Sequence, residues 1–205
     1  MVSRQPLPRA FYARPTLLVA RELLGARLVR VLNGQRISGL ITETEAYIGS
    51  QDLACHAKAG LTPRTRVMFG PPGHAYVYFT YGMHWLCNFV TESDGFPAAV
   101  LLRALEPQEN LEFIAAQRAG RPRREWTDGP AKLCQALAIN GELNGYDLCQ
   151  PQGDLLIEQG IPVPDSNVTT GPRVGLNTVP EPWKSKPWRF LATLPENGAG
   201  AKTSN

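Results

Sequence analysis

The stretch HAYVYFTYGMHWLCNFV, residues 74–90, does most to decide the fold. Its aromatic and β-branched residues predict two strands, and Gly82 marks the bend between them. Three of the six tyrosines in the chain fall here, together with Phe79, Trp85 and His84. So much aromatic surface serves either a core or a platform for flat ligands, and the sequence around it must decide between them.

Outward from this hairpin, the sequence alternates between strand and helix patterns. Asn33-Gly34 is a hairpin turn signal between two strands. Residues 50–73 form a loop-rich connection long enough to carry function. Further strands are predicted at 26–32, 35–49 and 98–105, and helices at 15–24, 107–120 and 130–140. We therefore predict one α+β domain with a curved, mostly antiparallel, open-barrel-like sheet and surrounding helices. Its expected bounds are 11–196, after an N-terminal arm at 1–10 and before a disordered tail at 197–205.

Composition limits the class of protein further. The 205 residues are 43% hydrophobic and 19% charged, which is typical of a soluble globular chain, and the net charge of +3 permits an anionic partner. No stretch is long and apolar enough to span a membrane. The arginines near the N-terminus fit a transit segment, but we favour a lead into the first helix. The four cysteines lack zinc-site spacing, so we expect reduced, mostly buried thiols and no metal or cofactor: Cys55, Cys87, Cys134 and Cys149.

The segment ETEAY, residues 43–47, places Glu43, Glu45 and Tyr47 on one face of a strand. The default interpretation is a solvated edge strand, because charged residues are mostly exposed. The alternative is a carboxylate beside an aromatic wall in a cleft, where it could orient and deprotonate a water molecule.

Three other polar residues lie where a pocket could use them. His56 lies in the long loop, Asn88 in a strand, and Arg103 at the end of an apolar strand. Structural hydrogen bonding is the more common role for buried polar residues. A polar pocket floor is the alternative.

The hairpin tyrosines divide by position. Tyr76 and Tyr78 share a strand face, and with Trp85 they fit a core. Tyr81 lies at the bend, where its side chain should project outward, and insertion between nucleic-acid bases is one use of such a wedge. Basic clusters near tryptophans fit either a solvated face or phosphate contacts: Arg64 and Arg66; Arg118, Arg121, Arg123 and Arg124; Lys184, Lys186 and Arg189.

Taken together, five segments resemble the alkyladenine (3-methyladenine) DNA glycosylase family. They occur in order across residues 11–191: ETEAYIGSQDLACH (43–56), TPRTRVMFGPPGHAYVYFTYGMHWLCN (62–88), VLLRALEP (100–107), GPAKLCQALAIN (129–140) and RVGLN (173–177). Departures are small. His84 stands where the family can have another aromatic residue, and Thr65 where asparagine is frequent.

The resemblance implies a role for each matching residue. Glu45 is the implied catalytic base and Arg103 the arginine beside the catalytic water. Tyr81 is the implied intercalating side chain. The implied base pocket comprises Tyr47, His56, Tyr78, Asn88 and Val174, of which Asn88 screens purine substituents. The expected DNA-backbone contacts are Arg64, Arg66, Tyr76, Met83 and Lys132.

The implied activity is hydrolysis of the N-glycosidic bond of damaged purines in double-stranded DNA, leaving an abasic site without lyase chemistry, metal or cofactor. We expect a monomer that acts in the cytoplasm on a bacterial-type chromosome, or in the nucleus of a eukaryote. The alternatives are a lesion-recognising module without chemistry, which needs no pocket carboxylate, and a sugar glycosidase, which uses two flanking carboxylates.

Overall fold

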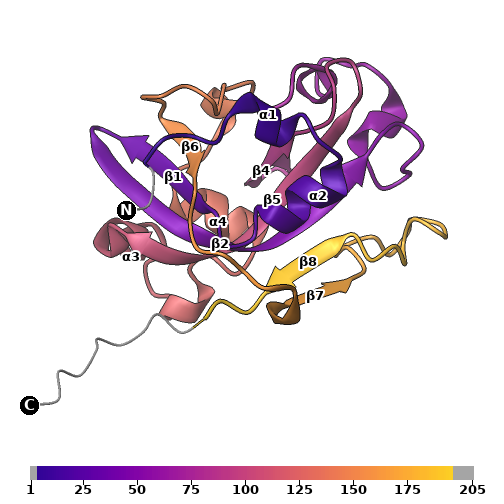
Figure 1. Cartoon of the computed structure of the whole chain (residues 1–205). Helices are drawn as coiled ribbons and strands as arrows, with labels where there is room; N and C mark the ends of the chain where they lie inside the picture. The colour runs from indigo at the N-terminus through magenta and orange to yellow at the C-terminus, as the bar shows by residue number, and fades with distance from the viewer. Residues whose placement is uncertain (1–3, 196–205) are drawn as a thin grey trace, which may run out of the picture.

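The structure is a computed structural model, and it describes residues 4–195. An eight-stranded antiparallel sheet forms its centre, in the order β3-β4-β5-β2-β1-β6, with β7 and β8 attached through β2 (Figure 1). The sheet is curved and not closed, as predicted. Its strands are β1 (Arg27–Leu32), β2 (Gln35–Ile48), β3 (Ala75–Thr80), β4 (His84–Val90), β5 (Ala98–Glu109), β6 (Leu155–Glu158), β7 (Val168–Gly171) and β8 (Arg189–Ala192).

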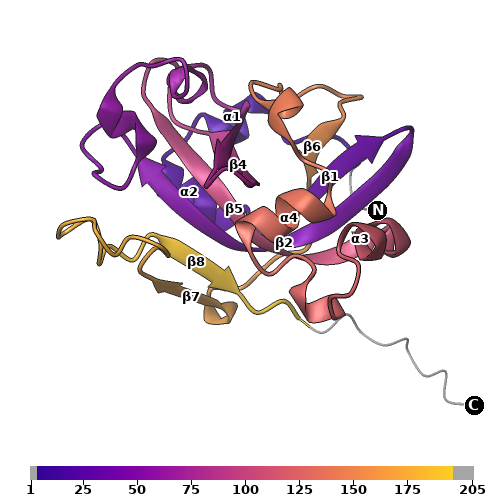
Figure 2. The same ribbon diagram turned by 180° about the vertical axis from the view of Figure 1, so that it is seen from behind.

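Four short α-helices accompany the sheet. In the two views, α2 lies in front of β2 in Figure 1 and α4 lies in front of it in Figure 2. Together these helices help to bury one continuous apolar core that includes Val19 of α2 and Leu133 of α4. The helices are α1 (Arg9–Tyr12), α2 (Thr16–Glu22), α3 (Leu111–Gln117) and α4 (Pro130–Ala136). Short 3-10 helices occur at His56–Ala59, Arg66–Phe69, Arg123–Glu125, Gly141–Leu143 and Asp165–Asn167.

The long strand β2 determines the shape of the sheet. Its pairing with β5 shifts register on both sides of Glu43, and such bulges bend a strand. Along its other edge, β2 pairs first with β1 and then, from Glu43 to Glu45, with β8. The catalytic candidates of the ETEAY segment therefore lie where β2 is bent and has a strand on each side.

Both predicted hairpins are present, with a two-residue connection between Leu32 and Gln35 and a three-residue connection between Thr80 and His84. Asn33 and Gly34 have φ of 52° and 75°, and Tyr81 and Gly82 have φ of 52° and 66°. Two consecutive residues with positive φ are the signature of a type I′ turn, which matches the twist of the flanking strands. Asparagine and glycine suit that turn, whereas a tyrosine in its first position is unusual.

Two predicted helices are too long: the one expected at 130–140 ends at Ala136, and the one expected at 107–120 ends at Gln117 and also begins late. The helix expected from residue 107 begins only at Leu111, and Pro107 is still part of β5, opposite Gly39 of β2. Strand pairing continues to Glu109, and the Asn110 side chain then caps the helix by accepting a hydrogen bond from the Phe113 amide. The strand expected at 98–105 is correspondingly four residues longer.

Near the N-terminus, the expected arm boundary at residue 10 falls inside α1. Before it, the Leu7 amide already donates to Ile157 O of β6. The expected tail at 197–205 lies outside the described residues. The cysteines are free thiols, three buried and Cys149 half-buried. Within residues 4–195, no helix has the length and apolar character needed to cross a membrane.

Candidate active site

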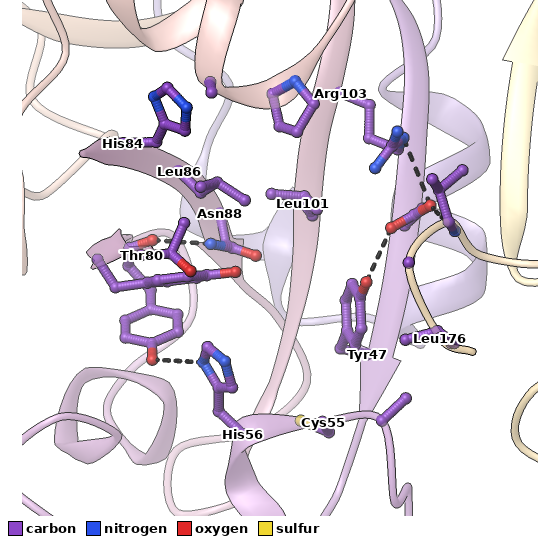
Figure 3. A pocket seen from close by; sticks show the side chains of 18 of the residues that line it. Tyr47, Cys55, His56, Thr80, His84, Leu86, Asn88, Leu101, Arg103 and Leu176 are labelled. Atoms are coloured by element: carbon purple, nitrogen blue, oxygen red, sulfur yellow. Dashed lines mark hydrogen bonds and ion pairs between the residues drawn. The ribbon is translucent and has the colours of Figure 1, made fainter. Parts of the chain in front are cut away.

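A cavity of about 330 Å³ opens between β2 and the hairpin of β3 and β4, and Figure 3 shows its lining side chains. Its walls come from segments that are distant in the sequence. The strands β2 to β5 provide half of the lining residues, and the start of α4, the loops near residues 55 and 175, Met68 and Tyr81 provide the rest. Predicted pocket residues that line it are Glu45, Tyr47, His56, Tyr78, Asn88, Arg103 and Val174, joined at the mouth by Tyr81.

Glu45 is fully buried at one wall of this cavity. Its Oε1 accepts a hydrogen bond from the Val174 amide at 2.7 Å, and its Oε2 accepts one from the Tyr47 hydroxyl at 2.8 Å. Arg103 Nε lies 3.4 Å from Oε1. The default interpretation of a solvated edge strand is therefore wrong. Here β2 has a strand on each side, and the Glu45 carboxylate contacts Arg103, Tyr47 and the Val174 amide.

Glu43 has a different environment two residues earlier. Arg103 Nε donates to its Oε1 at 2.7 Å, and Arg189 Nε approaches the same oxygen at 3.5 Å. Glu43 does not line the cavity. Of the two carboxylates, only Glu45 is therefore placed to meet a molecule in the cavity.

Burial sets the protonation behaviour of this wall. It raises the pKa of Glu45 above the ordinary value, while Arg103 and the Val174 amide oppose the rise by stabilising the carboxylate. Burial and the nearby Glu45 raise the pKa of the Tyr47 hydroxyl well above its usual range, so this group stays a hydrogen-bond donor. The wall presents an oriented carboxylate that can accept a proton once it is ionised.

The opposite wall is aromatic. The rings of Tyr76 and Tyr78 lie 5.2 Å apart between centroids, and the His56 ring lies 4.6 Å from that of Tyr78. His56 Nδ1 is 2.9 Å from the Tyr76 hydroxyl. Burial, helped by Arg64 and Lys58, lowers the pKa of His56 to about 4, so the imidazole is neutral at physiological pH.

The floor of the cavity comes from β4 and β5. Asn88 Nδ2 donates to Tyr76 O at 3.0 Å, which fixes the orientation of its amide. His84 and Leu86 share its strand face, and Leu101 lies beside it on β5 (Figure 3). The floor thus combines the apolar Leu86 and Leu101 with His84 and one oriented amide.

Tyr81 projects from the hairpin tip at the mouth of the cavity, and 86% of it is exposed. The outward direction predicted for this side chain is confirmed. Its neighbour Met83 is 66% exposed. A non-glycine residue with positive φ is held there at an energetic cost, and such strain is concentrated at functional sites.

The expected backbone contacts have different surroundings. Arg64 and Arg66 are exposed, and Arg64 lies 5.0 Å over the ring of Tyr78. Lys132 pairs with Asp128 at 2.8 Å. Tyr76 is only 1% exposed, and its hydroxyl is next to His56, so it lies inside the pocket rather than on a surface that faces DNA.

Sequence reasoning missed two residues that hold the site together. Asp52 and Arg173 form a fully buried ion pair directly behind Tyr47. Arg173 precedes Val174 in the RVGLN segment, which was the available signal. Other lining residues that were not singled out are small or apolar: Ala54, Cys55, Met68, Thr80, Leu86, Leu101, Pro130, Ala131, Gly175 and Leu176.

This fold and cavity define a class of protein: a curved-sheet α+β domain with an aromatic slot beside a buried carboxylate, under an exposed aromatic turn. The family profile described as methylpurine-DNA glycosylase (MPG) matches residues 10–195. The chain belongs to the methylpurine-DNA glycosylase family, and the resemblance and enzyme class predicted from its motifs are confirmed.

Three relatives are about half identical to this chain over most of its length. A protein of Methanocella arvoryzae is 52% identical over 185 residues, covering 90% of each chain. One of Myxococcus xanthus is 53% identical, covering 90% of this chain and 88% of its own, and one of Carboxydothermus hydrogenoformans is 50% identical, with 90% and 93% covered. Each carries the provisional name of a 3-methyladenine DNA glycosylase.

Proposed function

We propose that this protein is a DNA repair glycosylase that flips damaged purines out of duplex DNA and hydrolyses their N-glycosidic bond with water activated by Glu45. One observation carries the proposal: a buried carboxylate, held by Val174, Tyr47 and Arg103, forms one wall of a cavity whose opposite wall is aromatic. Family membership supplies the class of reaction.

The base must leave the stack before it can reach this cavity. Extrusion costs a few kcal/mol, least for damaged pairs, and glycosylases as a class use it. In this proposal Tyr81 enters the gap in the duplex, because it is the exposed aromatic residue at the mouth of the cavity. Filling the gap slows the return of the base.

The extruded base lies between Tyr47 on one side and Tyr78 with His56 on the other. Stacking on aromatic side chains contributes about 1–3 kcal/mol per base. A cationic alkylated purine gains further attraction to the rings, on the order of 0.5–2 kcal/mol. Asn88 at the floor restricts which purine substituents fit.

Glu45 acts on the sugar rather than on the base. As the C–N bond lengthens, positive charge develops on the sugar, and the nearby carboxylate stabilises it. The same carboxylate holds a water molecule and accepts its proton as the water attacks. Arg103 lowers the pKa of Glu45 against the larger effect of burial and so favours the ionised form. A positioned general base contributes about 10²–10⁴-fold to the rate.

Hydrolysis without strand cleavage is part of this proposal, and the lining of the cavity is consistent with it. Lyase chemistry by a glycosylase uses an amine nucleophile that forms a Schiff base. Among residues 4–195, the lining contains no lysine, and Lys132 near the start of α4 is paired with Asp128. The product is therefore an abasic site.

Labelled duplexes, each containing one damaged purine, test the proposal. The protein is incubated with duplexes containing 3-methyladenine, 7-methylguanine, hypoxanthine or ethenoadenine, and with an undamaged duplex, and each sample is then treated with alkali. Alkali-dependent breaks at the lesion are expected, and none in the undamaged duplex. Tight, lesion-selective binding without breaks would instead identify a recognition module.

A further inference from the structure

The buried pair of Asp52 and Arg173 lies behind the candidate site without lining it. Both side chains are 0% exposed, and they meet through two hydrogen bonds, Nη1–Oδ2 at 2.5 Å and Nη2–Oδ1 at 2.9 Å. Burying two charges is expensive, so such a pair is weak evidence for stability by itself. Its neighbours indicate what else it does.

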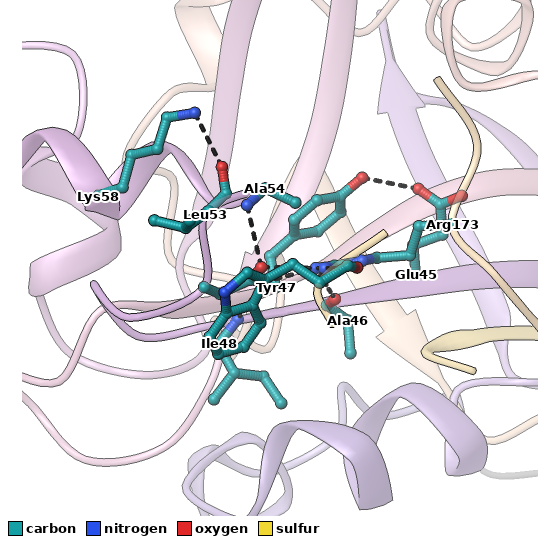
Figure 4. A network of polar contacts seen from close by, with 10 residues as sticks. Glu45, Ala46, Tyr47, Ile48, Leu53, Ala54, Lys58 and Arg173 are labelled. Carbon is teal, nitrogen blue, oxygen red and sulfur yellow. Dashed lines mark hydrogen bonds and ion pairs between the residues drawn. The ribbon is translucent and has the colours of Figure 1, made fainter. Parts of the chain in front are cut away.

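Arg173 joins three segments of the chain. Its guanidinium donates to Ala46 O of β2 at 2.9 Å and to Trp183 O at 3.1 Å. It also lies 4.7 Å over the ring of Tyr47 (Figure 4) and 5.0 Å over the ring of Trp188. Since Tyr47 lines the cavity and Arg173 does not, the arginine supports the tyrosine from the far side.

Val174, the residue after Arg173, contacts Glu45 directly. Its amide donates to Glu45 Oε1 at 2.7 Å. The Arg173 guanidinium donates four hydrogen bonds, and these leave the Arg173 backbone little freedom to move. The direction of the Val174 amide is fixed with it.

Asp52 extends the same support to the loop at the aromatic wall. Its carboxylate accepts hydrogen bonds from the Ala54 amide at 3.0 Å and from the Ile48 amide at 3.3 Å. Ala54, Cys55 and His56 of that loop all line the cavity. One ion pair therefore connects both walls.

We propose that Arg173, held by Asp52, is a positioning residue that keeps the Val174 amide on Glu45 and the Tyr47 ring against the cavity, and so sets the reactivity of the carboxylate without touching the substrate. The inference rests on the role proposed for Glu45 and extends it to residues that line no part of the cavity.

Loss of the support from Arg173 should change the pKa of Glu45 in one direction. The groups that face Glu45 are Tyr47 on its own strand, Arg103 on β5, Tyr78 on β3 and the Val174 amide. Glu43, also on β2, opposes its ionisation. Arg189, paired with Glu45 in the β2–β8 register, directs its Nε to Glu43. Without the Val174 amide, one of the interactions that stabilise the Glu45 carboxylate disappears, so the pKa of Glu45 rises. As the pH is lowered, the excision rate should therefore begin to fall at a higher pH than in wild type.

The test compares Arg173→Lys with a matched control, Arg36→Lys. Arg36 also makes a two-bond ion pair with a buried carboxylate, that of Glu158, at 3.0 and 2.9 Å. It lies nine residues before Glu45 on β2, roughly 30 Å along the strand. The pKa of Glu45 is measured by ¹³C NMR of labelled carboxyl groups, and excision is measured under single-turnover conditions from pH 5 to 8, with thermal melting of each protein.

Both variants are expected to melt at lower temperature than wild type. Only Arg173→Lys should raise the pKa of Glu45, move the acidic limb of the pH–rate profile upward and slow excision at pH 7, on the order of 10- to 100-fold. If Arg173→Lys does not fold, Asp52→Asn takes its place, because it keeps the acceptor for the Ala54 amide. An unchanged Glu45 pKa in a folded variant would overturn the proposal. The NMR result does not depend on activity, so absence of excision by wild type would contradict the proposed function alone.

Discussion

At the scale of single residues, environment separates two glutamates that the sequence places on one strand face. Glu43 is neutralised by Arg103 and approached by Arg189, whereas Glu45 is fully buried and faces the cavity. Similar groups in different surroundings acquire different pKa values and different roles. Burial of Glu45 disfavours its negative charge, while the Val174 amide, Tyr47 and Arg103 orient its carboxylate.

This opposition predicts that the ionised Glu45 carboxylate destabilises the fold. The pKa of Glu45 is raised in the folded protein, so its contribution to stability is full below the ordinary glutamate value and is lost as pH rises through the raised value. We expect Glu45→Gln to raise the melting temperature at pH 7 and to lose this advantage towards pH 4. Glu43→Gln should lower the melting temperature at pH 7, since it removes the partner of Arg103. A melting temperature of Glu45→Gln below that of wild type at pH 7 would contradict this prediction.

A second residue-scale prediction concerns the neutral imidazole. Tyr76→Phe removes the hydroxyl that holds His56 Nδ1. One hydrogen bond contributes about 1 kcal/mol, so kcat/KM for a damaged duplex should fall roughly fivefold. Tyr12→Phe is the control, because Tyr12 is equally buried and its hydroxyl has no hydrogen-bond partner among residues 4–195. Equal effects of the two changes would show that His56 does not depend on Tyr76.

The sequence predicts the site unevenly at this scale. Strand periodicity places Glu45 and Tyr47 on one face, and hairpin parity places Tyr76 and Tyr78 on another. The pairing of Asp52 with Arg173 links positions 121 residues apart, and no local pattern marks it. The bond from the Val174 amide to Glu45 is equally hidden, because a backbone donor carries no side-chain signal.

At the scale of elements, the two hairpin turns differ in length and in the residues that form them. The first has Asn33-Gly34, which a type I′ turn favours, and the second has Tyr81-Gly82 with the same φ signs. Local sequence predicted both bends, yet the start of α3 was misplaced because the pairing of Pro107 with Gly39 continues the strand. Long-range pairing overrides local patterns, so element ends are harder to predict than elements.

The strained turn yields an element-scale prediction. Asparagine tolerates positive φ better than tyrosine, so Tyr81→Asn should leave the protein as stable or more stable, by up to about 1 kcal/mol. Excision should nevertheless fall roughly tenfold or more, because aromatic stacking between bases is lost. Met83→Ala, in the same exposed turn, is the control and should have a smaller effect. Thermal melting measures the stability and single-turnover rates measure the excision of each variant. Undiminished excision by Tyr81→Asn would show that insertion of Tyr81 into the duplex is not needed.

At the scale of the whole molecule, the cavity exists only because the curved sheet brings distant segments together. The bend of β2, the β3–β4 hairpin, the loop near residue 55 and the loop near residue 175 meet around it. Exposed basic side chains, among them Arg64 and Arg66, lie on the loop that leads into this hairpin. A duplex over the cavity mouth would place phosphates near them.

The salt dependence of DNA binding tests that placement. Each neutralised phosphate contributes about 0.9 to the slope of log affinity against log salt concentration. Arg66→Gln should therefore reduce the slope by about 0.9 and weaken binding to damaged and undamaged duplexes alike. Arg21→Gln is the control, since Arg21 lies on α2, pairs with Asp165 and lines no part of the cavity. Fluorescence anisotropy at several salt concentrations measures both, and identical slopes would show that DNA binds elsewhere.

The most direct test of the account measures wild type and Glu45→Gln on one hypoxanthine-containing duplex. Both the Kd and the single-turnover rate constant of base release are determined at pH 7. We expect a Kd within a few-fold of wild type and a rate constant lower by about 10²–10⁴-fold, because the Glu45→Gln pocket still binds the DNA but lacks the general base. A Glu45→Gln protein that releases the base at nearly the wild-type rate would contradict the central claim that Glu45 activates the water.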